Sequence, residues 1–157
     1  VHFPVAHTDA RLLEIVRGAF TPQEVVDKIF LFAKLIKFMP VEIHESSGLV
    51  SMRLLVTMLN EACQIWQDNT ASMEDIDKEF TITFGQRYGI FEYADIVGIE
   101  KIVMLMEDMF HDYGDRKYKA STVLWRLYRS KQYGLLTKRG FYIYDESGKK
   151  VGPNNLI

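Results

Sequence analysis

Residues 44–66 read HESSGLVSMRLLVTMLNEACQIW, and this stretch decides the fold. Apolar side chains recur along it at helical spacing and widen beyond a single stripe, so several neighbouring elements should cover this helix. Ser46 or Ser47 is predicted to cap the first turn. We therefore expect the central helix of a mainly α-helical domain. Periodicity alone favours a core helix with no further role, but a ligand could approach its first turn from the preceding loop.

The composition is that of a globular chain of about one domain's length. The 157 residues are 48% hydrophobic with a net charge of −2 and no basic block, which argues against a general nucleic-acid or anionic-membrane binder. The single Cys63 excludes an internal disulfide and a cysteine-based zinc site, and no metal site is expected. Cysteine usage favours a reducing, cytoplasmic location. No apolar run approaches the roughly 18 residues of a membrane span.

Residues 1–45 are expected to form a strand–helix–strand unit. Residues 11–18 are typical of a short strand that ends at glycine, residues 21–24 of a capping box with proline, and residues 40–44 of a second strand. This crossover implies a parallel sheet, which two strands cannot make alone. Because the chain also begins at Val1 rather than Met, we expect it to be part of a longer protein.

The chain after the central helix is predicted to be helical until shortly before Gly134. Residues 134–144 are typical of a loop with a short extended piece, and residues 145–157 of a flexible tail. The expected domains are thus 1–45, 46–144 and the tail. The further helices are expected over 76–83, over 91–113 with Gly98 able to divide it, and after a capping Ser121.

Five segments carry motifs whose order and spacing are more specific than any one of them. They are His2-Phe3 with residues 12–18, residues 46–55, residues 72–77, residues 89–98 and residues 134–144. These segments resemble, in the same order, HFFNP…LVEIVxG, SPGFIVNRLL, SPEDID, GPFELxDxxG and GRKTGKGFYxY of the 3-hydroxyacyl-CoA dehydrogenases, including the 3-hydroxybutyryl-CoA enzymes. The resemblance covers about residues 1–144.

The resemblance implies a two-domain enzyme. Its N-terminal Rossmann domain binds NAD, and its C-terminal helical domain closes the acyl-CoA site and mediates dimerisation. The glycine-rich dinucleotide fingerprint is missing here, so residues 1–45 should be the last βαβ unit of the Rossmann domain, and the chain alone should bind NAD poorly. The implied partners are a 3-hydroxyacyl-CoA and a second copy. Lys34, Lys37 and Lys138-Arg139 could meet the CoA phosphates, although lone basic residues are usually solvated.

His2 and Glu14 fall where the family places its catalytic pair. Histidine can accept the hydroxyl proton because its pKa lies near neutrality. A carboxylate on its other ring nitrogen would fix the tautomer and stabilise the imidazolium ion. The alternative is a histidine and a strand glutamate without a joint role. Ser46 and Met52 are the expected substrate-binding positions.

Met52 stands where the family has the asparagine that helps hold the reacting oxygen of the substrate. A thioether donates no hydrogen bond, and losing one such donor costs about 3–4 kcal/mol of barrier, or roughly 10²–10³ in rate. Ser51 lies about 100° round an ideal helix and is expected to be a poor substitute. The family's loop prolines are also replaced, by Ser47 and Ile90.

Three interpretations stay open. The chain is the C-terminal domain of an NAD-dependent 3-hydroxyacyl-CoA dehydrogenase; or a catalytically impaired homologue that acts as a dimerisation or acyl-CoA-binding module; or an unrelated helical interaction module with accidental motifs. A homodimer is expected because apolar surface is predicted around Leu105, Met106, Met109 and Trp125.

Overall fold

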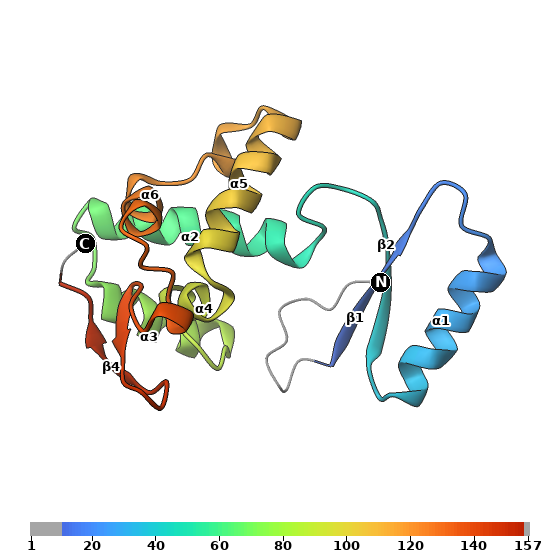
Figure 1. Cartoon of the computed structure of the whole chain (residues 1–157), viewed down its shortest axis with the longest axis horizontal. Helices are drawn as coiled ribbons and strands as arrows, with labels where there is room; N and C mark the ends of the chain where they lie inside the picture. Colours follow the sequence, from blue (N-terminus) through green and yellow to red (C-terminus); the bar gives the residue numbers. More distant parts are fainter. Residues whose placement is uncertain (1–10, 156–157) are drawn as a thin grey trace. The chain divides into compact units, whose positions relative to one another are not determined.

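The computed structural model describes residues 11–155, which form two compact units (Figure 1). The first unit ends at Leu54 and the second starts at Leu55. The boundary expected at residues 45 and 46 therefore lies inside the first unit. The backbone N–H of Ser51 donates a hydrogen bond to Glu14, which joins the start of the central helix to the first unit.

The first unit is a strand–helix–strand crossover. Strands β1 (Leu12–Arg17) and β2 (Met39–His44) pair in parallel, and helix α1 (Gln23–Leu35) connects them. The predicted βαβ unit is thus confirmed. The capping box is not formed, because α1 has Pro22 at its N-cap and no side-chain cap. The core of the unit lies between β1 and α1 and consists of Leu13, Ile15, Val26 and Ala33.

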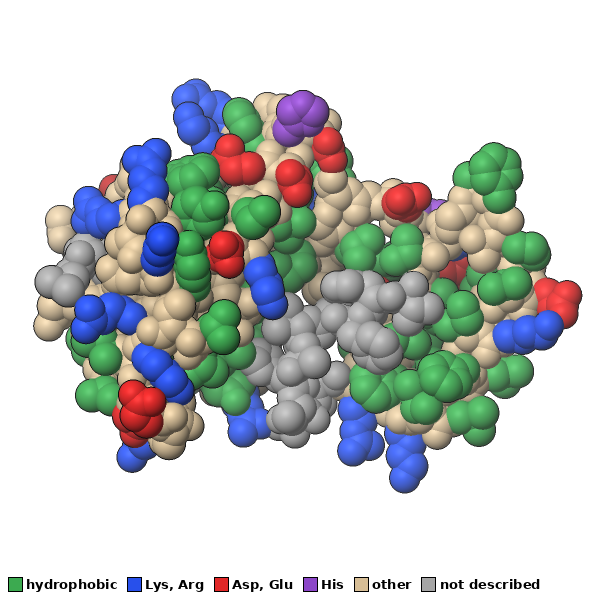
Figure 2. Space-filling view, in the orientation of Figure 1, with side chains coloured by type: hydrophobic (Ala, Val, Ile, Leu, Met, Phe, Trp, Pro, Cys, Tyr) green, Lys and Arg blue, Asp and Glu red, His purple; other side chains and the backbone are tan. Residues whose placement is uncertain are grey.

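Much apolar surface of the first unit remains exposed. Figure 2 shows hydrophobic side chains gathered over this unit. A two-stranded sheet with one helix cannot cover them, since a stable sheet needs further strands or a second layer. The exposed side chains on or next to α1 and β2 are Phe20, Val25, Leu31, Phe32, Leu35, Ile36, Met39 and Val41.

The second unit is helical, as predicted. Helix α2 (Ser51–Gln67) continues into it from the first unit. The other elements are α3 (Met73–Phe84), α4 (Ile90–Val97), α5 (Ile99–Tyr113), η1 (Arg116–Tyr118), α6 (Thr122–Arg129), η2 (Leu135–Thr137), β3 (Tyr142–Tyr144) and β4 (Lys150–Pro153). None of the described helices is long and apolar enough to cross a membrane.

An aromatic cluster forms part of the core of the second unit. The rings of Phe91 and Phe141 lie 4.7 Å apart, and Trp66 on α2 contacts both edge-on. Phe91 and Phe141 are fully buried, so the cluster joins α2, α4 and the segment before β3. Burial of two large rings is a major apolar contribution to this packing.

Two helix boundaries agree with the sequence and two do not. Gly98, at φ +102°, separates α4 from α5, and the Ser121 hydroxyl caps α6 by accepting the N–H of Leu124. Helix α3 starts at Met73, three residues before the expected position. Helix α2 starts at Ser51, so neither predicted serine, Ser46 or Ser47, is at its N-cap position.

The expected flexible tail contains an ordered strand instead. Residues 145–149 form a turn in which Asp145 accepts the backbone N–H groups of Ser147 and Lys149. Strand β4 then pairs antiparallel with β3. The Asn154 N–H donates to the Phe141 carbonyl at 2.9 Å, and its side chain donates to the Gly140 carbonyl at 2.7 Å. Residues 150–153 therefore form a strand paired with β3.

The apolar surface predicted on α5 is also wrong in part. Met106 and Met109 are fully buried inside the second unit and Leu105 and Trp125 are partly buried. The sequence predicts that these side chains form an apolar surface that faces a second copy. These side chains are instead covered, fully or in part, by neighbouring elements of the same unit.

Candidate functional site

Glu14 is a buried carboxylate in the middle of β1. Only 2% of its surface is exposed, and it lies opposite Val41 in the register with β2. Its neighbours Leu13 and Ile15 belong to the core against α1. Because side chains alternate across a strand, the Glu14 carboxylate lies on the face away from α1.

This carboxylate meets the N-terminus of α2. The backbone N–H of Ser51 donates to Glu14 Oε1 over 3.3 Å. The first N–H groups of a helix have no intrahelical partner, and a negative charge there is favourable. Glu14 therefore satisfies one of these donors and ties β1 to α2. The arrangement also gives a buried charge the hydrogen bonding that it needs.

The loop that leads into α2 is tightly turned. The Leu49 N–H donates to the Ser46 carbonyl, while Gly48 at φ +77° and Leu49 at φ +50° both have left-handed backbone conformations. For leucine this conformation is strained, and such strain often accompanies a site that must be held in shape. The loop places Ser51 and Met52 in the first turn, and both are half-buried.

The Ser51 side chain has an unusual environment. Its Oγ is buried and has no hydrogen-bond partner among the residues that the structure describes. A buried hydroxyl without a partner costs free energy. Since native proteins keep few such groups, this one calls for a specific explanation.

The other predicted site residues are only partly placed. His2 lies outside the described residues, so the His2–Glu14 pair stays a prediction. Lys34 and Lys37 are exposed in the first unit, and Arg139 is exposed in the second. Lys138 donates to the Glu146 carbonyl within its own unit. No group of three or more metal-ligating side chains occurs between residues 11 and 155.

Sequence analysis missed a pair of buried aspartates in the second unit. Asp77 on α3 accepts the N–H groups of Phe91 and Glu92, at 2.8 and 3.1 Å, and so caps α4. Tyr142 donates its hydroxyl to the same carboxylate at 2.9 Å. Asp77 is thus a structural link from α3 to α4 and β3. Burial raises its pKa, and the three donors oppose that shift.

Asp95 on α4 holds the β3 segment in the same way. It accepts the N–H groups of Phe141 and Tyr142, at 2.8 and 2.9 Å, and the Tyr144 hydroxyl at 3.0 Å. Burial raises the pKa of Asp95 to about 7, although these donors lower it. The partners lie 46 to 49 residues away in sequence, so no local pattern announced them.

Three glycines of the family-like motifs make room for these aspartates. A Cβ on Gly89 would overlap the Asp77 side chain, and one on Gly140 would overlap the Asp95 carboxylate. Gly134, at φ +100°, lies against the Asp95 backbone. The motifs at 72–77, 89–98 and 134–144 therefore describe one structural junction rather than catalytic groups. Aspartate and glycine at matched motif positions were the available signal.

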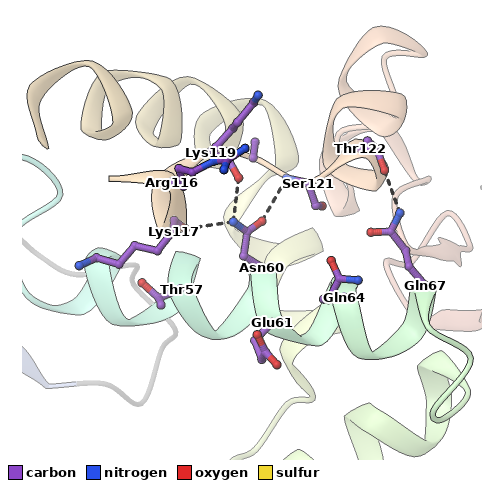
Figure 3. Close-up of a pocket in the computed structure, with 11 residues that line it drawn as sticks. Thr57, Asn60, Glu61, Gln64, Gln67, Arg116, Lys117, Lys119, Ser121 and Thr122 are labelled. Atoms are coloured by element: carbon purple, nitrogen blue, oxygen red, sulfur yellow. Dashed lines mark hydrogen bonds between the residues drawn. The ribbon is translucent and has the colours of Figure 1, made fainter. Parts of the chain in front are cut away.

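A polar groove of about 520 Å³ lies between α2 and residues 116–122 (Figure 3). Its centre is Asn60, whose amide donates to the carbonyls of Lys117 and Lys119 and whose oxygen accepts the Ser121 N–H. Asn60 satisfies three backbone groups from η1 to the start of α6 at once. Its role is therefore to fix the entry into α6.

An apolar groove of about 460 Å³ lies between α2 and α3 in the same unit. Met58 and Phe84 on its rim are 44% and 62% exposed, and the neighbouring Ile82 is 73% exposed. The ring centroids of Phe80 and Phe84 lie 5.2 Å apart, with the ring planes tilted by 54°. Exposed apolar groups gathered at a groove are typical of a binding surface.

Comparison with known proteins identifies the helical part. The family model for the C-terminal domain of 3-hydroxyacyl-CoA dehydrogenase matches residues 48–144. A 3-hydroxybutyryl-CoA dehydrogenase of Clostridioides difficile is 34% identical over 136 residues, which cover 87% of this chain and 48% of that protein. A probable 3-hydroxybutyryl-CoA dehydrogenase of Bacillus subtilis is 29% identical over 146 residues, covering 93% and 51%.

Solved structures agree. The (S)-3-hydroxybutyryl-CoA dehydrogenase of Ralstonia eutropha matches with a TM-score of 0.81 and 26% identity, over 88% of this chain and 49% of that one. This chain spans about half the length of the curated relatives that it matches. The resemblance stated from the sequence is confirmed, and accidental motif matches are excluded.

Proposed function

This chain belongs to the 3-hydroxyacyl-CoA dehydrogenase family, whose C-terminal domain it carries at residues 48–144. We propose that the chain is the C-terminal part of an NAD-dependent enzyme that oxidises a 3-hydroxyacyl-CoA similar to 3-hydroxybutyryl-CoA. It completes the acyl-CoA site. The observation that carries the proposal is the buried Glu14, which is hydrogen-bonded to the first turn of α2.

The residues of this chain supply the proton chemistry. Oxidation at carbon 3 removes a hydride from that carbon and a proton from its hydroxyl, which leaves a carbonyl. His2 accepts the proton, and Glu14 holds the imidazole in the right tautomer and stabilises its charged form. Ser46 and Met52 would contact the acyl-CoA.

In this proposal NAD is bound mainly by the part of the protein outside this chain, and it would accept the hydride. The chain itself does not fit a dinucleotide site, because the loop after β1 begins Gly18-Ala19-Phe20 and no glycine-rich phosphate-binding turn occurs in the sequence. The uncovered apolar side chains over α1 and β2 support a larger sheet, because further strands and helices of a Rossmann domain would bury them.

The test is turnover by the intact protein, of which this chain is part. We expect NAD reduction with (S)-3-hydroxybutyryl-CoA. His2→Gln should lower kcat by about 10²–10⁴-fold, the usual contribution of a general base. Glu14→Gln tests the carboxylate in the same assay. Its matched control is Glu24→Gln, on the exposed face of α1, which should leave the rate unchanged. Intact NAD binding without turnover would contradict the proposal.

A second candidate function rests on Met52. In a catalytically impaired homologue, the chain would serve as a dimerisation or acyl-CoA-binding module, because the thioether cannot replace the family's amide donor. The intact protein would then bind acetoacetyl-CoA without turning over its reduced form. A homodimer and a cytoplasmic location are proposed in either case.

A further inference from the structure

The buried hydroxyl of Ser51 is the observation from which this inference starts. Its backbone N–H is used by Glu14, while its Oγ has no partner among the described residues. The fold does not need this hydroxyl, since alanine would fit the same space and leave no unsatisfied group. We take the unpaired hydroxyl, on a residue whose backbone meets a buried carboxylate, as a group available to a ligand.

Position distinguishes Ser51 from Met52. Both stand in the first turn of α2, but Ser51 is the one bonded to Glu14. The rotation of about 100° between neighbours on a helix was expected to turn Ser51 away from the site. The bond from its backbone N–H brings the main chain of Ser51 to the Glu14 carboxylate, and the Oγ that no described residue pairs belongs to this same residue. A hydroxyl also donates and accepts hydrogen bonds, whereas a thioether donates none.

We propose that the Ser51 hydroxyl hydrogen-bonds the reacting oxygen of the 3-hydroxyacyl-CoA and supplies the donor that Met52 lacks. This inference rests on the proposed function. As the proton leaves the substrate hydroxyl, negative charge grows on that oxygen, and a donor fixed beside it stabilises the transition state more than the ground state. Ser51 would then compensate for the replaced family asparagine.

The thermal stability of the intact protein gives the first test. Ser51→Ala should raise Tm by about 2–4 °C, because it removes a buried hydroxyl without a partner. Ser121→Ala is the matched control and should lower Tm, because the Ser121 hydroxyl caps α6. A fall in Tm for Ser51→Ala would show that the hydroxyl serves the fold, and the proposal would be overturned.

Turnover by the intact protein gives the second test. Ser51→Ala should lower kcat about tenfold or more with a smaller change in KM, since the bond strengthens in the transition state. Ser51→Thr keeps the hydroxyl and should retain most of the rate. Met52→Asn should restore the rate in the Ser51→Ala background and add little when Ser51 is present. Unchanged kcat in Ser51→Ala would overturn the proposal.

Binding separates this proposal from the proposed function. Acetoacetyl-CoA carries the oxygen that Ser51 would contact, so Ser51→Ala should weaken its binding to the intact protein about fivefold or more. If the intact protein shows no turnover but Ser51→Ala weakens this binding, the contact stands and the dehydrogenase proposal fails. Binding that is unchanged in Ser51→Ala overturns the contact whatever the turnover.

Discussion

Single residues in this chain gain their roles from partners far away in sequence. Glu14 meets Ser51, Asp77 meets Tyr142, and Asp95 meets the backbone before β3. Each carboxyl group is buried and accepts at least one backbone N–H, which lowers the cost of burying a polar group. The three differ in consequence, because one lies at the proposed site and two hold the second unit together.

Removing the Asp95 carboxylate should have a large effect on stability. Asp95→Ala leaves two buried N–H groups and the Tyr144 hydroxyl without their acceptor and opens a small cavity. We expect a loss of about 3–5 kcal/mol in the free energy of unfolding, measured in urea. Asp108→Ala, on the exposed face of α5, should change it by less than about 0.5 kcal/mol. Equal effects would contradict the role given to Asp95.

The raised pKa of Asp95 has a definite sign in stability. Its folded value of about 7 exceeds the unfolded value of about 3.9, so the folded state keeps the proton while the unfolded state loses it. Stability from this group is therefore full below about pH 4 and falls as the pH rises to about 7, by up to about 4 kcal/mol.

Carbon NMR of the Asp95 carboxyl tests that titration. The midpoint should lie near the folded pKa, and Tyr144→Phe should raise it because a donor to the carboxylate is lost. Asp77, whose pKa burial also raises, titrates in the same network. A midpoint below about 4 would mean that the donors outweigh burial.

At the scale of elements, the sequence predicted what depends on near neighbours. Gly98 divides two helices and Ser121 caps one, and both signals lie within four residues of their effect. The βαβ unit followed from alternating patterns of strand and helix. The Glu14–Ser51 bond spans 37 residues, and α2 begins at Ser51, after the turned loop, rather than directly after Ser46 or Ser47. Such contacts are fixed by the fold rather than by local sequence.

The last strand shows the same limit and allows a direct test. Asn154 joins β4 to the Phe141 and Gly140 carbonyls. Asn154→Ala should lower stability by about 1–3 kcal/mol and speed amide exchange in β3 and β4, because a buried carbonyl loses its donor. Asn155→Ala, at the exposed next residue, is the control. Equal amide exchange rates in the two variants would indicate that residues 145–155 are a mobile tail.

At the scale of the whole molecule, two apolar surfaces remain uncovered. One lies over α1 and β2 of the first unit and the other at the α2–α3 groove of the second. We expect them to meet different partners. Further strands and helices, as proposed above, would cover the first surface, and a second copy of the chain would cover the second. The sequence analysis predicts a dimer through α5 rather than through the α2–α3 groove. Periodicity shows how apolar a helix is, but it does not show which side of the helix its neighbours cover.

The exposed apolar side chains at the α2–α3 groove predict a dimer that a single charged substitution should dissociate. The chain of 18.3 kDa should have twice that mass by light scattering, since burying exposed apolar area gives about 25 cal/mol per Å². Phe84→Glu and Ile82→Glu should each give the monomer without unfolding it, because both side chains are mostly exposed. Leu136→Glu makes the same change on an exposed residue away from the groove and should leave the dimer intact. Leu35→Glu tests the other apolar surface. If Leu35→Glu gives a monomer while Phe84→Glu stays dimeric, the chain self-associates through α1 and not through the α2–α3 groove.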